Sequence, residues 1–287
     1  MPLTQGQAQL NGILTLGLGT EYHLIATDFF SWPSNRSSRT PAPTQSGWVF
    51  DPIDLFSGRT ASVEIIIKAV DRPLLSAMRE LSEACTQVTE GQMLTLDMFL
   101  PHDDGPKRLT GRVRDLAFPE YDRKTYGSST LAIMIFETEL PHATSIAENS
   151  RESSLAVSSG GHTFNATFNQ VFGASGSGGS FQINNAGNTP SSPIFRINGP
   201  VTNPRIFHQD LDRGITFNIV IAASDFLLID VRNSEILLNG TASRYFTLTN
   251  SSRWFNLSPG VNNLFYSADT YDADATLTTL WYDAYRV

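Results

Sequence analysis

The chain has 287 residues and a formal net charge of −8, from 20 basic and 28 acidic side chains, with 40% apolar and 17% charged residues. This length predicts two domains of roughly 150 residues each, and so few charges exclude a chain held unfolded by charge repulsion. There is no basic run to neutralise a row of phosphates, which excludes specific nucleic-acid binding, and the one cysteine, Cys85, excludes an intrachain disulfide and a thiolate metal cage.

The first segment with a strong structural signal is the β-branched run Ser62–Val70. It predicts a strand with both faces largely covered. Pro73 follows, and apolar residues then recur at three- and four-residue steps as far as Cys85, which predicts one amphipathic helix over about 73–87. No earlier segment carries an assignment.

A hairpin and one more strand complete the first half. Apolar residues alternate along Gln92–Leu100, and the turn-forming sequence 101–106 connects this strand to Lys107–Phe118. Leu131–Leu140 predicts a further strand. These elements predict a first domain at 1–148 that is built on a sheet with one helix.

The segment 149–190 reads as linker and loops. Between Glu152 and Arg196 no residue is charged, and Gly, Ser and Asn dominate. Such a composition cannot fill a core along its whole length. We therefore place the second domain at 191–287, with residue 160 as an earlier alternative start.

The second domain shows strand signals and no helix. Turn signals such as Asn239-Gly240 and Pro259-Gly260 separate the short apolar runs. Seven or eight strands at this spacing predict an antiparallel β-sandwich, formed by 192–199, 214–222, 226–231, 235–239, 244–248, 262–267 and 275–286. The fold class is therefore mainly β, α+β overall.

Residue patterns give no support for catalysis. No two of the five histidines stand at metal-ligand spacing, and Asp269, Asp272 and Asp274 lack the glycine and glutamate of a calcium loop. Glu137 and Glu139 share a strand face, which an exposed sheet explains more simply than a carboxylate pair. We expect no catalytic, metal or cofactor-binding residue, and no cofactor.

Aromatic residues near the C-terminus are the one group with binding potential. Aromatic faces on a β-sandwich can stack on sugar rings, and Trp254 and Tyr271 are the candidates for glycan contact. The alternative is a role in the core. Alternation along Leu280–Tyr285 requires that at least some of the aromatic side chains be core.

Five segments point to a family when they are taken in order. The C-terminal part resembles the distal tail proteins of phages with long non-contractile tails, and the matching segments are 185–188, 193–204, 227–240, 254–262 and 281–285. Tyr282 stands where the family often has arginine. The first part is similar more loosely, through Arg59, the strand and helix after it, and the hairpin 92–118, with Ser46-Gly47 in place of an Asp-Gly.

This resemblance implies a structural virion protein. Family members form a homohexameric ring at the distal end of the tail, between the tail tube and the tail-tip, tail-associated and tape-measure proteins. It further implies a tail-tube-like β-barrel or sheet in the first domain, a galectin-like sandwich in the second, and synthesis in the host cytoplasm. Apolar residues are candidates for packing or contact in the ring domain, namely Ile65, Ile67, Leu74, Met78, Leu81, Leu96 and Met98.

Two other functions remain open. A carbohydrate-binding adhesin that contacts the host surface would use the aromatic residues of the sandwich, and it overlaps with the tail role if the sandwich touches a cell-wall glycan. An enzyme would require a catalytic cluster, which the sequence lacks. We expect no membrane partner, because no stretch approaches the roughly 18 to 20 apolar residues that span a bilayer and the N-terminus lacks a signal-like basic region.

Overall fold

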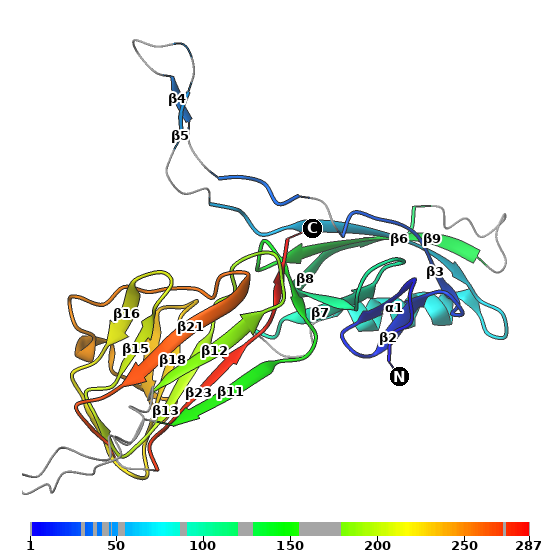
Figure 1. Cartoon of the computed structure of the whole chain (residues 1–287). Helices are drawn as coiled ribbons and strands as arrows, with labels where there is room; N and C mark the ends of the chain where they lie inside the picture. The colour runs from blue at the N-terminus through cyan, green and yellow to red at the C-terminus, as the bar shows by residue number, and fades with distance from the viewer. Residues whose placement is uncertain are drawn as a thin grey trace, which may run out of the picture. The chain divides into compact units, whose positions relative to one another are not determined.

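The chain forms two compact units in the computed structural model (Figure 1), which describes residues 2–29, 32–36, 39–41, 46, 48–50, 55–86, 91–119, 129–154, 179–271 and 274–286. Unit 1 consists of Met1–Ile146 together with Tyr285–Val287, and unit 2 consists of Ala147–Ala284. The chain therefore passes from unit 1 to unit 2 and returns for its last three residues.

Unit 1 is a large antiparallel sheet with one helix and a separate two-stranded ribbon. Its helix is α1 (Leu74–Cys85). Its strands are β1 (Gln7–Leu10), β2 (Leu14–Gly17), β3 (Tyr22–Thr27), β4 (Arg39–Pro41), β5 (Trp48–Phe50), β6 (Thr60–Lys68), β7 (Leu94–Phe99), β8 (Lys107–Ala117), β9 (Ser129–Thr138), β10 (Ala143–Ser145) and β24 (Ala284–Tyr285), the last of which straddles the unit boundary.

The order of the main sheet is β2-β1-β7-β8-β9-β6-β3, with β10 and β24 attached beside β8. Within the described residues no ladder joins β2 to β3, so the sheet is open and the barrel form of the prediction is wrong. Closure would require the strands at the two ends of the order to pair with each other. The sheet alternative is what the chain forms.

One face of this sheet packs against α1. The helix buries Leu74, Ala77, Met78, Leu81 and Ala84, which recur at three- and four-residue steps along one side. Alternate residues of β6, β7 and β9 join the same apolar cluster. The helix begins at Leu74 after Pro73, one residue later than predicted, and no side chain caps it.

Unit 2 contains three antiparallel sheets (Figure 1). Its elements are β11 (Asn149–Ser154), β12 (Ser180–Asn185), β13 (Ile194–Asn198), β14 (Val201–Thr202), β15 (Arg205–His208), β16 (Arg213–Thr216), β17 (Val220–Ile221), β18 (Phe226–Asp230), β19 (Glu235–Leu238), β20 (Ala242–Ser243), the 3-10 helix η1 (Tyr245–Thr247), β21 (Gly260–Ser267), β22 (Thr270–Tyr271) and β23 (Thr276–Trp281).

Two of these sheets make a sandwich. The six-stranded sheet has the order β11-β23-β13-β18-β19-β20, the four-stranded sheet has the order β12-β21-β15-β16, and β17-β14-β22 form a small third sheet. Side chains of both large sheets meet in one apolar cluster, with Phe195 and Leu277 from the first and Ile206 and Leu264 from the second. The mainly β fold class, with one α-helix, is therefore confirmed.

The segment expected to be linker and loops is partly strand. Strands β11 and β12 lie within 149–190 and belong to the two large sheets of unit 2. β11 has only polar side chains and is almost wholly exposed, so it carries no hydrophobic pattern that sequence reasoning could use. The middle of the segment, residues 155–178, lies outside the described residues.

In the part of the chain that the structure describes, no helix has both the length and the apolar composition needed to cross a membrane.

Candidate functional site

The described residues contain no group of three or more His, Cys, Asp or Glu side chains that could hold a metal ion. Asp269 is instead engaged by Arg205 at 2.5 Å and by the Asn203 side chain at 2.9 Å. Asp272 lies outside the described residues. Glu137 forms an ion pair with Arg114.

The two candidate glycan residues occupy different settings. Trp254 is half-buried and packs against the apolar core of unit 2. The backbone of Tyr271 lies in β22, opposite Val201 of β14, and its side chain is outside the described part of the structure. Trp281, from the same aromatic set, is buried, and its Nε1 donates to the Asn184 carbonyl at 3.2 Å. In unit 2 the described aromatic rings serve the core far more than the surface.

The seven ring-domain candidates all lie in the core of unit 1. Ile65 and Ile67 of β6, Leu96 and Met98 of β7, and Leu74, Met78 and Leu81 of α1 are all buried and belong to one cluster. Within a single chain these side chains hold the helix on the sheet. Of the two roles expected for these residues, packing inside the domain or contact between copies, their contacts within one chain are packing contacts.

Among the described residues, no helix packs on the other face of the same sheet. We call it the helix-free face and define it by Glu64, Ile66, Ile133, Ile135 and Asp115. Its strand pairs set Glu64 opposite Ile133 and Asp115 opposite Ile135, so acidic and apolar side chains lie next to each other. These side chains are half-buried, except for the exposed Asp115. A sheet face that is not fully covered in one chain is available to other molecules.

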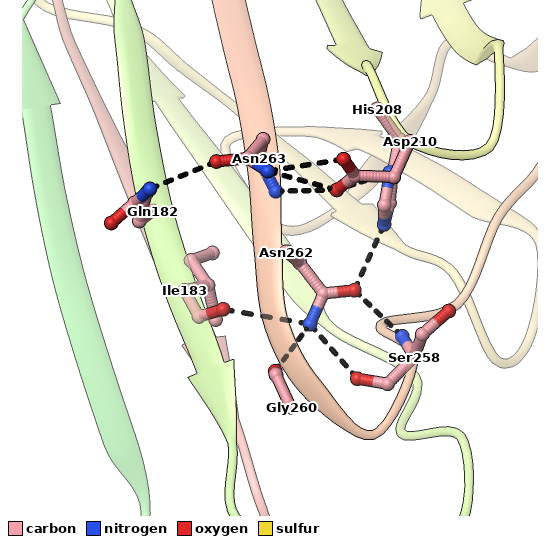
Figure 2. A network of polar contacts seen from close by, with 8 residues as sticks. All are labelled: Gln182, Ile183, His208, Asp210, Ser258, Gly260, Asn262 and Asn263. Atoms are coloured by element: carbon pink, nitrogen blue, oxygen red, sulfur yellow. Dashed lines mark hydrogen bonds and ion pairs between the residues drawn. The ribbon is translucent and has the colours of Figure 1, made fainter.

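A polar network in unit 2 organises one end of the four-stranded sheet (Figure 2). Asn262 of β21 is fully buried, and its Nδ2 donates to the carbonyls of Ser258 and Gly260, each at 2.9 Å. Its Oδ1 accepts the Ser258 backbone N–H at 2.7 Å. One side chain thus closes the turn around Pro259-Gly260 by replacing the water that the backbone would otherwise need.

His208 of β15 completes the buried part of this network. Because the Asn262 amide nitrogen donates to carbonyls, its oxygen must accept, so His208 Nε2 donates to it at 2.9 Å. The imidazole also meets the Phe255 ring edge-on, with centroids 5.4 Å apart. His208 Nδ1 is buried with no hydrogen-bond partner among the described residues and lies 3.9 Å from Asp210 Oδ2.

On the exposed side, Asp210 is held by the next residue of β21. The Asn263 backbone N–H donates to Asp210 at 2.9 Å and its side-chain amide donates at 3.0 Å, while the amide oxygen accepts from Gln182 at 2.9 Å. These hydrogen bonds, the backbone one first, hold the pKa of Asp210 below its usual range. Asn262 and Asn263 are neighbours on β21, and their side chains lie on opposite faces of the sheet. Through them β21 is linked to β12 on one side and to β15 and the loop after it on the other.

A second polar cluster joins the first and last of the five family-like segments. Asn185 is fully buried, its Nδ2 donates to the Thr189 carbonyl at 2.9 Å, and its Oδ1 accepts from Gly187 at 3.1 Å and from Ala284 at 3.3 Å. Asp283 accepts the Ala186 N–H at 2.9 Å. A Cβ on Gly187 would lie 1.9 Å from the Ala284 oxygen, so only glycine fits this close approach.

An exposed aromatic pair was missed by sequence reasoning. Residues 244–248 were predicted as a strand, but they form the single turn η1, which exposes Phe246 by 80% and Tyr245 by 50%. Asn218 holds the turn by donating its N–H to the Thr247 carbonyl at 2.8 Å. The only available signal was the adjacency of two aromatic residues in a polar stretch, which does not fit the alternation of a half-buried strand.

Comparison with known proteins gives one family and one fold. Residues 186–283 match the family described as siphovirus-type tail component, C-terminal domain. A search of curated proteins finds no match. The polar turns described above, from Ala186 to Asp283, coincide with the limits of the family match.

Solved structures extend the likeness to the whole chain. The Dit protein (gp 19.1) of phage SPP1, whose structure is described as a paradigm of the hub adsorption apparatus in phages that infect Gram-positive bacteria, superposes with a TM-score of 0.62 at 12% identity, over 96% of this chain and 97% of that chain. Two structures of the phage P2 baseplate in its activated conformation, with Ca and with Sr, match over the same shares with a TM-score of 0.46 at 9% and 8% identity. The resemblance noted in the sequence is confirmed.

Proposed function

We propose that this chain, which carries a siphovirus-type tail component domain and has the fold of the SPP1 hub protein, is the distal tail protein of a phage tail. It acts as a structural part of the virion and not as an enzyme, and it forms a homohexameric ring that connects the tail tube to the tail-tip and receptor-binding proteins. The fold likeness over 96% of the chain carries the proposal, because it includes both units in one arrangement of elements along the sequence.

Unit 1 is the part that forms the ring. The main sheet ends at β2 and β3, and in the described residues neither outer edge has a strand partner. Unpaired edges favour pairing with another sheet. The unpaired β3 edge would pair with a strand of the next copy, and such a repeated head-to-tail contact can close a ring. β3 carries a bulge at Ile25, whose side chain is 53% exposed.

The helix-free face lines the channel through which DNA leaves. Residues 1–152 hold 13 basic and 19 acidic side chains, a net charge of −6. Glu64, Asp115 and Glu137 lie on this face together with the basic Lys68 and Arg112. Because carboxylates stand among the cations of this face, it offers the phosphates of DNA no row of positive charge to bind, and the duplex moves past it. α1, on the opposite face, then lies outside the channel.

The native mass of the purified chain tests this proposal, together with negative-stain images of the same sample. Six copies of 31.5 kDa make about 189 kDa, and we expect that mass with an open centre. Ile25→Lys should dissociate the ring into folded monomers, because it places a charge at the edge contact. Val261→Lys, at a side chain in unit 2 that is 58% exposed, is the matched control and should leave the ring intact.

A monomer at every concentration tested, alone and with tail tube protein added, would overturn the ring. Loss of the ring in Val261→Lys but not in Ile25→Lys would move the contact from unit 1 to unit 2. In the virion, the tail tube, tape-measure and tail-associated proteins are the partners of this ring, and the chain is made in the host cytoplasm before assembly.

A second function, host-surface glycan binding, is favoured by one observation. η1 exposes the rings of Tyr245 and Phe246 on a turn held by backbone hydrogen bonds, and an ordered, exposed aromatic pair is suited to stacking on a sugar. Binding of the full chain to purified cell-wall polysaccharide should fall at least tenfold in Phe246→Ala. Equal polysaccharide binding by Phe246→Ala and by Trp254→Ala would mean that η1 is not the binding site.

A further inference from the structure

The C-terminal residues contact a part of unit 1 that is distant in the sequence. The described residues 32–36, 39–41, 48–50 and 55–57, here called the arm, comprise a root, where Asn35 bridges to Phe56, and the two-stranded hairpin β4–β5 (Figure 1). Its root is closed by Arg36, whose N–H donates to the Leu55 carbonyl at 2.6 Å, and by Ser57, whose N–H donates to the Ser34 carbonyl at 2.9 Å. Further out, β4 and β5 pair with each other and not with the main sheet.

Arg286 contacts both legs of this root. Its guanidinium carbon lies 4.2 Å from the centroid of the Phe56 ring, on the returning leg, and 5.7 Å from that of Trp32, on the outgoing leg. Both distances are within the range of cation–π attraction. Because the two rings stand on opposite legs, a single cation draws both legs toward one point.

The residue before it is anchored on the main sheet. The Tyr285 ring lies 4.8 Å from the ammonium nitrogen of Lys107, at the start of β8, and Lys107 is itself buried and paired with Asp103. β24, which ends at Tyr285, also pairs with β10. Successive residues of the C-terminus are thus bound to the sheet and to the arm.

We propose that Tyr285 and Arg286 form a clasp that fixes the root of the arm to the main sheet of unit 1. The clasp is made by the last residues of a chain whose preceding segment, up to Ala284, belongs to unit 2. This inference does not require the proposed ring.

Hydrogen exchange of the full chain, followed by mass spectrometry, tests the clasp. In Arg286→Ala, amides of peptides that contain Arg36 and Ser57 should exchange about three- to tenfold faster, while β6 and β9 keep their protection. Arg286→Lys keeps the positive charge, so exchange of the arm amides in this variant should be faster than in the unmodified chain and slower than in Arg286→Ala. Arg151→Ala removes an exposed arginine from the edge strand β11 and should change nothing in the arm.

Unchanged exchange of the arm in Arg286→Ala would overturn the proposal. If that variant loses protection throughout unit 1, Phe56→Leu decides, because it removes one ring from the clasp and leaves an apolar side chain. Phe56→Leu should then speed exchange of the arm alone, and unchanged exchange there would equally reject the clasp. In the double variant Arg286→Ala, Phe56→Leu, effects that simply add would mean that the two groups do not act together.

Discussion

At the scale of single residues, two buried asparagines fix turns of unit 2 by hydrogen bonding to their backbone groups. An asparagine amide can accept and donate at once, so it can satisfy a whole turn whose backbone groups are shielded from water. Asn262 does this for the Pro259-Gly260 turn and Asn185 does it for the turn at Gly187. Both stand in segments that resemble the distal tail proteins. Their place in those segments has a structural explanation that needs no ligand.

Asn262→Ala should therefore destabilise unit 2 far more than the same change one residue later. It leaves the Ser258 N–H and His208 Nε2 buried without partners, at a cost of about 2–4 kcal/mol. Native-state hydrogen exchange of β21 amides should become at least about thirtyfold faster. Asn263→Ala removes only exposed hydrogen bonds and should change exchange by less than about fivefold. Equal acceleration of exchange in the two variants would contradict the structural role given to Asn262.

Acid should weaken unit 2 through Asp210. Its pKa is lower in the folded chain than the ordinary value of about 3.9, so its contribution to stability is complete above that value and is lost as the pH falls through the folded pKa. Asp210→Asn should lower stability at neutral pH and flatten the dependence of unfolding on pH below about 4. Urea unfolding at pH 7 and pH 3 measures both effects. Asp212→Asn, a change in the same loop, should retain the acid dependence of the unmodified chain.

At the scale of elements, α1 is held on the sheet by its apolar side and by one tyrosine. The Tyr22 hydroxyl of β3 lies 2.7 Å from Glu80 Oε2 and 3.0 Å from the Ala77 carbonyl, both on the helix. Burial, followed by the hydrogen bond to Glu80, raises the pKa of Tyr22. Arg72 pairs with Glu80 and with Glu21, so charges close the same junction from outside.

The single cysteine reports on this packing. Burial raises the pKa of the partly buried Cys85 thiol at the end of α1 to about 12, so at pH 8 it should react slowly with a disulfide reagent and faster when the helix opens. Leu81→Ala should cost about 2–5 kcal/mol and speed the reaction at least about tenfold. Leu75→Ala, on the same helix but 46% exposed, should leave the rate within about twofold. Similar rates in both variants would mean that the helix does not open as a unit.

Sequence reasoning found the elements whose apolar residues recur regularly. The strands β6, β7, β8 and β9 and the helix α1 lie within about two residues of their predicted limits. It missed β1 and β2, which are four residues each and lie among glycines, and β11, which is polar. Short or polar strands form because a neighbouring strand offers hydrogen bonds, and that information is absent from the strand itself.

The polar network around Asn262 could not be predicted from the sequence, because its members are far apart along the chain. His208 and Asn262 are 54 positions apart, and Asn262 and Ile183 are 79 apart. Nothing in the local sequence states that they meet. The resemblance found the right segments, but only the structure shows which of their residues lie side by side, such as Ala186 and Asp283.

At the scale of the whole molecule, the return of the C-terminus was not predicted. The sequence indicates two consecutive domains, whereas unit 1 includes Tyr285–Val287. Three residues carry too little pattern to assign to either domain, and only their pairing with β10 and their contacts with Lys107, Trp32 and Phe56 reveal where they belong.

Removing Tyr285–Val287 from the full chain should therefore destabilise unit 1 and spare unit 2. Loss of the cation–π contacts and of the β24 pairing corresponds to about 1–2 kcal/mol, or a melting temperature lower by about 3–8 °C. Calorimetry of the full and shortened chains measures the transition of each unit. A shift confined to unit 2 would contradict the division of the chain.

The same return sets the order in which the protein can be completed during its synthesis. Unit 1 receives β24 only after the residues of unit 2 have been translated, since β24 pairs with β10 and follows unit 2 in the sequence. At roughly 5–20 residues per second, that delay is on the order of ten seconds. Until then β10 lacks its pairing with β24, and the root of the arm lacks its contacts with Arg286.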